Sequence, residues 1–349
     1  MRPLLSPVLW LLSLLLGSLP GRAEEPERVL NLLCWTEYVP ASVIHGFEQK
    51  TGTHVAMVNY NSNDQMLEML AAKPGFYDLV QPSQAYVAGL IREHALTPIN
   101  RARIPNWSQL DPRFLGLSHD PEGRFSVPWL AGTVGIVVNT EVVKVPIREW
   151  ADVFSGAYRG RIVVVEDGRE MVAWALATLG LPLSAVDDAH LAQVTPLLRQ
   201  WLPQVRKFDS DSPHTALESG EAVIGIVWSG EAALLWQKSP KFQYVLPQKG
   251  AHMFLDSLAI PAKAPHQALA EEFINYCLEP EVSVLISKEY PYTNPNLGAR
   301  RLLSPEQLGN PASYPPGDPK LEPLHNEGND TKTVTEFVHR LRAELAPSK

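Results

Sequence analysis

The sequence predicts an α/β protein with two similar lobes, each a central sheet flanked by helices, joined by two crossover segments. Three observations support this fold class. The chain has 349 residues, enough for about two domains. Its residues are 45% hydrophobic and 19% charged, which allows a full core and excludes a disordered chain. Strand patterns alternate with helix patterns in two separate series, as expected for parallel sheets with helices on both faces.

The first series of elements predicts one lobe. Residues Val29–Cys34 are expected to form a strand, and its end, Leu32–Cys34, is an apolar run typical of a buried strand. Residues Ala41–Lys50 follow as a helix with Ile44 and Phe47 on one face, and Gly52 favours its termination. The further elements of this series are a strand at 54–59, a helix at 64–72, a strand at 77–81 and a helix at 84–93.

The second series predicts a second lobe with the same rhythm. It begins with a strand at 161–166, where three consecutive valines favour burial in a sheet. The further elements are helices at 170–179 and 191–201, a strand at 222–228, a helix at 230–237 and a strand at 242–246.

Two segments are suited to cross between the lobes. Residues 127–135 feed a strand at 136–138, and residues 256–261 lead to a helix at 267–278. If both cross, each lobe is built from discontinuous sequence. We then expect lobe 1 to contain residues 24–133 and 257–302, and lobe 2 to contain residues 134–256 and 303–349, with a proline-rich surface loop at 311–323 and a closing helix at 335–345.

Residues 1–23 have the pattern of a cleaved secretory signal peptide. Arg2 precedes the apolar stretch 4–16, which is short for a membrane span, and Gly21 and Ala23 suit a signal peptidase site. We therefore expect an exported protein. Loss of Arg2 and Arg22 would change the net charge from −8 to 28 − 38 = −10.

Composition also excludes several classes of function. The basic residues are scattered in a net acidic chain, which argues against a nucleic-acid partner. The sequence has no paired nucleophile and base, zinc signature or phosphate loop, so we expect no catalysis, no cofactor and no metal.

Cys34 and Cys277 are expected to be core residues rather than a disulfide.

Acidic and aromatic side chains stand at the ends of several predicted strands. Trp35, Glu37 and Tyr38 follow the first strand, and in an open α/β sheet this is where ligands bind. Aromatic faces attract ammonium groups and carboxylates pair with them. The arrangement predicts a site for a cation with an apolar body.

Further candidates repeat this layout, and each has a structural alternative. Asp167 and Glu170 follow the strand that ends at Glu166, but the pair could instead form a capping box of the next helix. Trp228 ends another strand, although it could be a core residue. Phe254 and Asp256 would share one face of an extended chain, whereas Asp256 could also be a turn residue or a helix cap.

Three more residues are ambiguous. Ser83 follows the third strand and could bind ligand or cap a helix. Tyr290 precedes a proline and His325 is isolated, so either could lie at the surface or at the site.

A linear polyamine fits the combined inventory, because its ammonium groups need carboxylates and its methylene spacers need aromatic walls.

Six motifs resemble those of bacterial periplasmic spermidine/putrescine-binding proteins, the substrate-capturing components of polyamine ABC transporters. The resemblance runs from about Leu30 to near the C-terminus. The motifs are Trp35-Thr36-Glu37-Tyr38-Val39-Pro40, Asp78-Leu79-Val80-x-Pro82-Ser83, Asp167-x-Arg169-Glu170, Gly225-Ile226-Val227-Trp228, Asp256-Ser257-Leu258-Ala259-Ile260-Pro261 and Pro295-Asn296-Leu297.

This resemblance implies a type II periplasmic-binding-protein fold that closes on its ligand, and it implies roles for individual residues. An aromatic box would surround the methylenes, formed by Trp35, Tyr38, Trp228 and Phe254. Ammonium groups would pair with Asp167, Glu170 and Asp256. Polar contacts near the ligand ends would come from Thr36, Glu37, Ser83, Ser210 and Tyr290.

The chain departs from the family's spermidine binders at three places. Ala85 stands where a tyrosine is common, Phe254 replaces a tryptophan, and His325 or Asn326 falls where a glutamine is expected. The retained carboxylates favour a triamine over putrescine, and His325 would make binding sensitive to pH. The expected function is delivery of a polyamine to a membrane ABC permease by a periplasmic monomer, with a polyamine sensor for a membrane receptor as the alternative.

Overall fold

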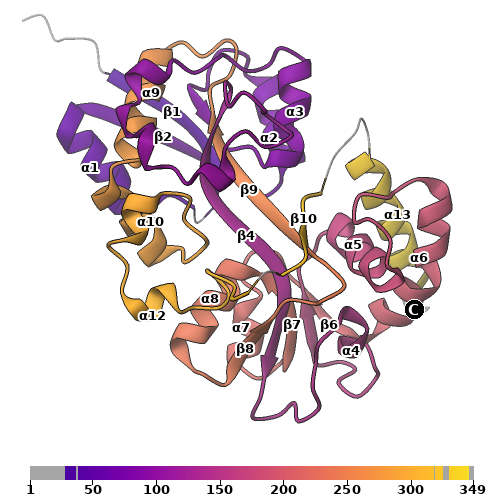
Figure 1. The fold of residues 1–349 in the computed structure, drawn as a ribbon. Helices are drawn as coiled ribbons and strands as arrows, with labels where there is room; N and C mark the ends of the chain where they lie inside the picture. Colours follow the sequence, from indigo (N-terminus) through magenta and orange to yellow (C-terminus); the bar gives the residue numbers. More distant parts are fainter. Residues whose placement is uncertain (1–27, 37, 318, 325–329, 346–349) are drawn as a thin grey trace, which may run out of the picture.

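The computed structural model describes residues 28–36, 38–317, 319–324 and 330–345. In this part of the chain ten strands form one continuous sheet, in the order β2-β1-β3-β9-β4-β7-β5-β6, with β10 beside β9 and β8 beside β4. Figure 1 shows two helix-covered halves joined by the long strands β4 and β9. The fold is therefore two-lobed, as the sequence predicts.

The first half contains the parallel strands β1–β3. Strand β1 lies between β2 and β3 and is parallel to both, and β3 is antiparallel to β9. The elements of this half are β1 (Arg28–Trp35), β2 (Thr53–Tyr60), β3 (Leu79–Val80), α1 (Ala41–Thr51), α2 (Asn63–Ala72), α3 (Gln84–Arg92), α9 (Gln267–Cys277), α10 (Pro280–Glu289) and α11 (Leu297–Arg300), with 3-10 turns at Arg101–Arg103, Pro105–Gln109 and Pro112–Phe114.

Strand β1 is mostly apolar, with Asn31 as a polar exception within it, because helices cover both faces of its sheet. Leu30 and Leu32 point to one face, where they join the core that includes Phe47 of α1 and Phe273 of α9. Leu33 points to the other face and joins the core of α2 and α3. Alternate residues of a strand point to opposite faces, so burial on both sides removes the polar alternation.

The second half repeats this arrangement around β5. This strand is parallel to both β6 and β7, and β7 is antiparallel to β4. The elements are β5 (Ile162–Val164), β6 (Val205–Phe208), β7 (Ile224–Trp228), β8 (Phe242–Val245), β10 (Leu321–Glu322), α4 (Trp150–Val153), α5 (Gly168–Leu179), α6 (Asp188–Trp201), α7 (His214–Glu218), α8 (Ser229–Lys238), α12 (Pro305–Leu308) and α13 (Asp330–Leu345), with a 3-10 turn at Leu202–Gln204.

Two strands belong to both halves. In β4 (Ser126–Asn139) residues up to Thr133 pair with β9 (Ala251–Ala259), and residues from Val134 on pair with β7. All 14 residues of β4 are buried. The change of partner supports the boundary that we propose between residues 133 and 134. The expected strand at 136–138 is thus one end of a much longer strand.

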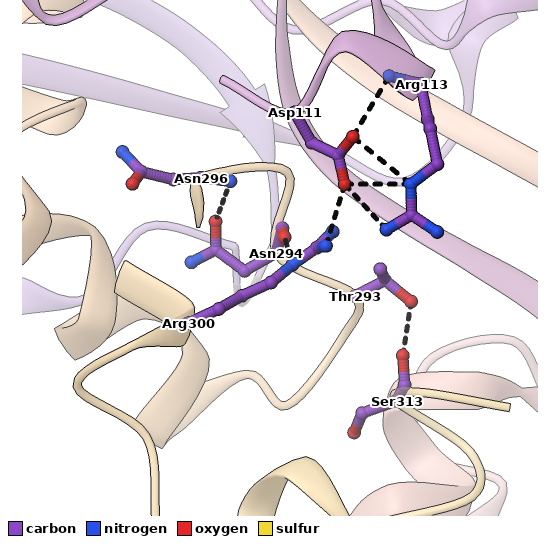
Figure 2. Close-up of polar contacts among 7 residues, drawn as sticks. All are labelled: Asp111, Arg113, Thr293, Asn294, Asn296, Arg300 and Ser313. Atoms are coloured by element: carbon purple, nitrogen blue, oxygen red, sulfur yellow. Dashed lines mark hydrogen bonds and ion pairs between the residues drawn. The ribbon is translucent and has the colours of Figure 1, made fainter. Parts of the chain in front are cut away.

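A third segment, residues 291–296, lies against this crossover. Thr293 exchanges two backbone hydrogen bonds of 2.9 Å with Ala131 of β4. Figure 2 shows how the segment is anchored: Arg300 reaches Asp111 at 2.8 Å, and its Nε donates to the carbonyl of Asn294. Arg113 donates to both carboxylate oxygens of Asp111, to Oδ1 at 3.2 Å and to Oδ2 at 2.6 Å. Tyr292, next to Thr293, is thereby fixed beside β4.

Several sequence expectations need correction or fall outside the described residues. The segment 311–323 is not only a surface loop, because Ala312 and Ser313 are 1% and 2% exposed and β10 lies within it. The closing helix begins at Asp330 rather than at 335. Cys34 and Cys277 are free and buried, as expected. The proposed signal segment, residues 1–23, lies outside the described residues. Among the described residues, no helix is long and apolar enough to cross a bilayer.

The Asp111 anchor gives a first prediction. Asp111→Ala would leave the guanidinium of Arg300 buried without its carboxylate, so we expect the free energy of unfolding to fall by about 3 kcal/mol. Hydrogen bonds from Arg113 lower the pKa of Asp111 to about 2, so this stabilisation is complete above about pH 4 and is lost as the pH falls toward 2.

Urea unfolding at pH 7 and at pH 3 measures this contribution. Glu122→Ala is the matched control, because its ion pair with Arg124 is exposed and its loss should cost less than about 0.5 kcal/mol. Equal stability of the two variants at pH 7 would contradict the anchoring role of Asp111.

Candidate functional site

A cavity of about 910 Å³ lies between the two halves. It is lined where β1, β3, β5 and β7 end, because the carboxyl ends of parallel strands in each half face the same gap. Strand β9 and helix α13 complete the walls. The eleven described residues that the sequence predicted for the site all line this cavity: Trp35, Thr36, Tyr38, Ser83, Asp167, Glu170, Ser210, Trp228, Phe254, Asp256 and Tyr290. The other two, Glu37 and His325, lie outside the described residues.

Aromatic rings line one continuous part of the cavity. Tyr38 contacts Tyr292, Tyr292 contacts Phe254, and Phe254 meets Trp228 edge to face, with centroid distances of 5.6, 5.9 and 5.6 Å. The sequence reasoning missed Tyr292 and chose Tyr290 instead. The signal that could have identified Tyr292 was its position two residues after Tyr290. Trp228 lines the cavity as well as packing against the core, so the two interpretations of this residue are compatible.

Asp256 is held by two hydroxyl groups. Tyr38 donates to its Oδ2 at 2.6 Å and Ser83 donates to its Oδ1 at 2.5 Å. Burial, at 5% exposure, raises the pKa of Asp256 to about 6, and the two hydrogen bonds oppose this rise. The turn and helix-cap alternatives for Asp256 are wrong, because it lies inside β9 opposite Leu130.

Ser83 occupies the N-cap position of α3, but its side chain makes no capping hydrogen bond. Its hydroxyl serves Asp256 instead, and it also accepts a hydrogen bond of 3.0 Å from Asn63. The helix-cap interpretation of Ser83 therefore describes its position and not the role of its side chain.

Asp167 and Glu170 divide the two roles that the sequence left open. Asp167 caps α5, because its Oδ1 accepts the backbone N–H groups of Arg169 and Glu170 at 2.8 and 3.1 Å. Burial, followed by the nearby charge of Glu170, raises the pKa of Asp167. Glu170 does not complete a capping box. Its Oε1 lies within hydrogen-bond distance of Nδ1 of His252, and its Oε2 is buried with no partner among the described residues.

His252 is a cavity residue that the sequence reasoning missed. It precedes Phe254 and Asp256 on β9 at a spacing of two, so all three side chains point to the same face of the strand, and all three line the cavity. Extending the strand pattern by two residues would have found it. A second histidine, His214, lines the cavity and pairs with Glu231.

The remaining predicted residues support the walls of the site. Ser210 accepts the backbone N–H of Glu166 at 2.8 Å and so connects the loop after β6 to the end of β5. Thr36 donates to Asn61 at 2.7 Å. Tyr290 ends helix α10 and lines the cavity.

The charge of the cavity wall is strongly negative. Its described residues include nine Asp or Glu side chains against two Arg and three His. One of the two, Arg342 of α13, is paired with Glu166 at 2.7 Å. A buried carboxylate without a partner is costly, and a cationic ligand would supply one. The site is therefore chemically suited to a cation whose apolar parts lie against aromatic rings.

Comparison with known proteins agrees with this geometry. Residues 42–312 match the family model of bacterial extracellular solute-binding proteins. The spermidine/putrescine-binding periplasmic protein of Escherichia coli is 34% identical over 335 residues, covering 95% of this chain and 96% of the relative. The putrescine-binding periplasmic protein PotF of the same species is 29% identical, covering 88% and 90%.

A solved structure shares the fold over nearly the whole chain. The substrate-binding protein PotD of a spermidine/putrescine ABC transporter from Streptococcus pneumoniae has a TM-score of 0.80 and 26% identity, covering 92% of this chain and 100% of that structure. The resemblance in the motifs and the two-lobed fold expected from it are thus confirmed. This chain belongs to the bacterial extracellular solute-binding protein family, and its relatives include spermidine/putrescine-binding periplasmic proteins.

Proposed function

We propose that this protein captures a polyamine in the cavity between its lobes and delivers it to a membrane ABC permease, without chemical change to the ligand. The observation that carries the proposal is the placement of three carboxylates, the partly buried Asp167 and the buried Glu170 and Asp256, in one cavity with a continuous aromatic wall. The names of the relatives support the ligand class and a periplasmic location.

The carboxylates supply the charge recognition. Asp256 keeps two donated hydrogen bonds, and an ammonium group would offset the cost of its buried charge. Glu170 retains one buried oxygen with no partner in the described structure, which suits a second ammonium group. A ligand with too few amines would leave one of these charges unpaired, so the site favours a triamine such as spermidine over putrescine.

The aromatic rings supply the spacing between the charges. Methylene groups gain from contact with Tyr38, Tyr292 and Phe254, and a desolvated cation over a ring gains about 0.5–2 kcal/mol. A ligand that carries charge without an apolar chain would not use this wall. Linear amines should therefore bind better than inorganic cations.

Calorimetric titration tests this function. The chain from residue 24 should bind spermidine, norspermidine or spermine more tightly than putrescine or cadaverine, with one ligand per monomer. No heat and no competition with any of the five amines would overturn the proposal.

Asp256→Asn should separate binding from stability. An ammonium group would lose its charged partner, so we expect spermidine affinity to fall by about 100-fold. The free energy of unfolding of the ligand-free variant should rise by about 2 kcal/mol at pH 7.5, since burial makes the ionised Asp256 unfavourable there. Glu122→Gln, which is exposed and outside the cavity, is the control for both measurements. Unchanged affinity in Asp256→Asn would rule out the assigned role.

The same carboxylate predicts how binding depends on pH. Because the pKa of ligand-free Asp256 is about 6, its protonation below that pH should weaken the binding of diamines and triamines alike. Its folded pKa lies above the ordinary value of 3.8, so the unfavourable contribution to ligand-free stability should fade as the pH drops from 7 toward 4. Titrations of affinity and of urea midpoint against pH measure both trends, and Asp256→Asn should lose the part of each that comes from this carboxyl group.

A further inference from the structure

The ring of Tyr292 lies against a helix position that carries no side chain. Gly230 is the second residue of α8, it is buried, and it lines the cavity. A Cβ atom at residue 230 would lie 2.7 Å from Cε1 of Tyr292 and closer still to Cζ and Cε2. Non-bonded carbon atoms attract each other best at about 3.5–4.0 Å, so the ring occupies space that any side chain at residue 230 would need.

The backbone gives no other reason for glycine at this position. Gly230 does not adopt the positive φ that favours glycine. It lies within a helix, where glycine is less favourable than alanine. The three atoms that a Cβ at residue 230 would approach most closely all belong to the Tyr292 ring. The close approach of this ring is therefore the feature that excludes a side chain here.

The other contacts of Tyr292 limit how its ring can move. The backbone next to it is fixed, because Thr293 exchanges two hydrogen bonds with Ala131 of β4. The ring itself contacts Tyr38 and Phe254, with centroid distances of 5.6 and 5.9 Å. All three rings line the cavity. A Tyr292 ring displaced from α8 would therefore turn toward the ligand space.

Phe254 cannot move away to make room for such a displacement. It stands opposite Gly132 in the pairing of β9 with β4. A Cβ atom at residue 132 would lie 2.8 Å from Cε1 of Phe254 and closer still to Cζ. The Phe254 ring thus already lies against the backbone of β4, as the Tyr292 ring lies against α8.

We propose that Gly230 is a positioning residue for ligand binding, because it lets the Tyr292 ring lie against α8 and so keeps that ring in the aromatic wall. This proposal rests on the proposed polyamine function, in which the wall contacts the methylene groups. Gly230 acts through Tyr292 and needs no contact of its own with the ligand. A side chain at residue 230 reduces affinity more than stability, because a ring that borders a cavity can rotate into it.

Gly230→Ala tests this role by separating affinity from stability. We expect spermidine affinity, measured by calorimetry, to fall about tenfold, which is the size of one ring contact. The urea midpoint of the ligand-free chain should change little, since alanine favours the helix and the ring has space to move.

A second substitution shows whether the effect passes through the ring. Tyr292→Leu removes the three ring atoms that approach Gly230, and by itself it should weaken binding. In the Tyr292→Leu background, Gly230→Ala should change affinity by less than about twofold, because two substitutions that act through one contact are not additive.

Gly46→Ala is the matched control. A Cβ atom at residue 46 of α1 would overlap the hydroxyl group of Tyr276, so this change also places a methyl group against a tyrosine. Neither of these described residues lines the cavity. Spermidine affinity should therefore remain at the wild-type value.

Each outcome decides between the alternatives. An affinity loss in Gly230→Ala that disappears in the Tyr292→Leu background supports the proposal. Unchanged affinity in Gly230→Ala, or the same loss in both backgrounds, overturns it. If Gly230→Ala does not fold, the double variant decides: a folded double variant that binds like Tyr292→Leu supports the proposal, and an unfolded one overturns it. A wild-type chain that binds none of the five amines overturns the proposed function instead.

Discussion

The antiparallel pairing of β4 with β9 is the constraint on which the site depends. This ladder joins residues 126–133 to residues 253–259 and belongs to both halves of the molecule. It brings Phe254 and Asp256 of β9 to the gap between the lobes, where the strand ends of each half converge. The segment around Thr293 adds to the same ladder through Ala131 and places Tyr292 on the aromatic wall.

Burial of acids in this gap has two physical consequences. It raises the pKa of Asp167 and of Asp256, which means that the ionised site is unfavourable without a ligand. The hydroxyl groups of Tyr38 and Ser83 orient Asp256 but cannot neutralise it. The folded protein without ligand bears this unfavourable free energy. A cationic ligand that relieves it therefore binds more tightly. Stability and binding are coupled through the same side chains.

His252 contacts one of the two carboxylate oxygens of Glu170 and so limits how a ligand can approach that group. The carboxylate keeps one oxygen on the imidazole and one with no partner in the described structure. The ring of Phe254 packs directly against the imidazole.

Most of the fold follows from local patterns in the sequence. The apolar run of β1, the valines of β5 and the alternating helices were predicted at nearly their observed positions, because burial on both faces leaves a mark on consecutive residues. Chain length and hydrophobic content likewise indicated two lobes. The strand-end positions of Trp35, Asp167 and Trp228 were enough to place them in one cavity.

The tertiary structure decided the partners of these side chains. Ser83 occupies an N-cap position, yet its hydroxyl donates to Asp256, 173 residues away. Glu170 stands where it could complete a capping box, but it contacts His252 instead, 82 residues away. The local sequence indicates the short-range capping hydrogen bond that each side chain could form. It does not indicate the distant group that each side chain contacts instead. The sequence by itself indicated eleven of the side chains that line the gap, several of them because strand ends converge there, but it did not indicate Tyr292 or His252. Which of them hold each other, and which remain available to a ligand, depended on how β9 lies across both lobes.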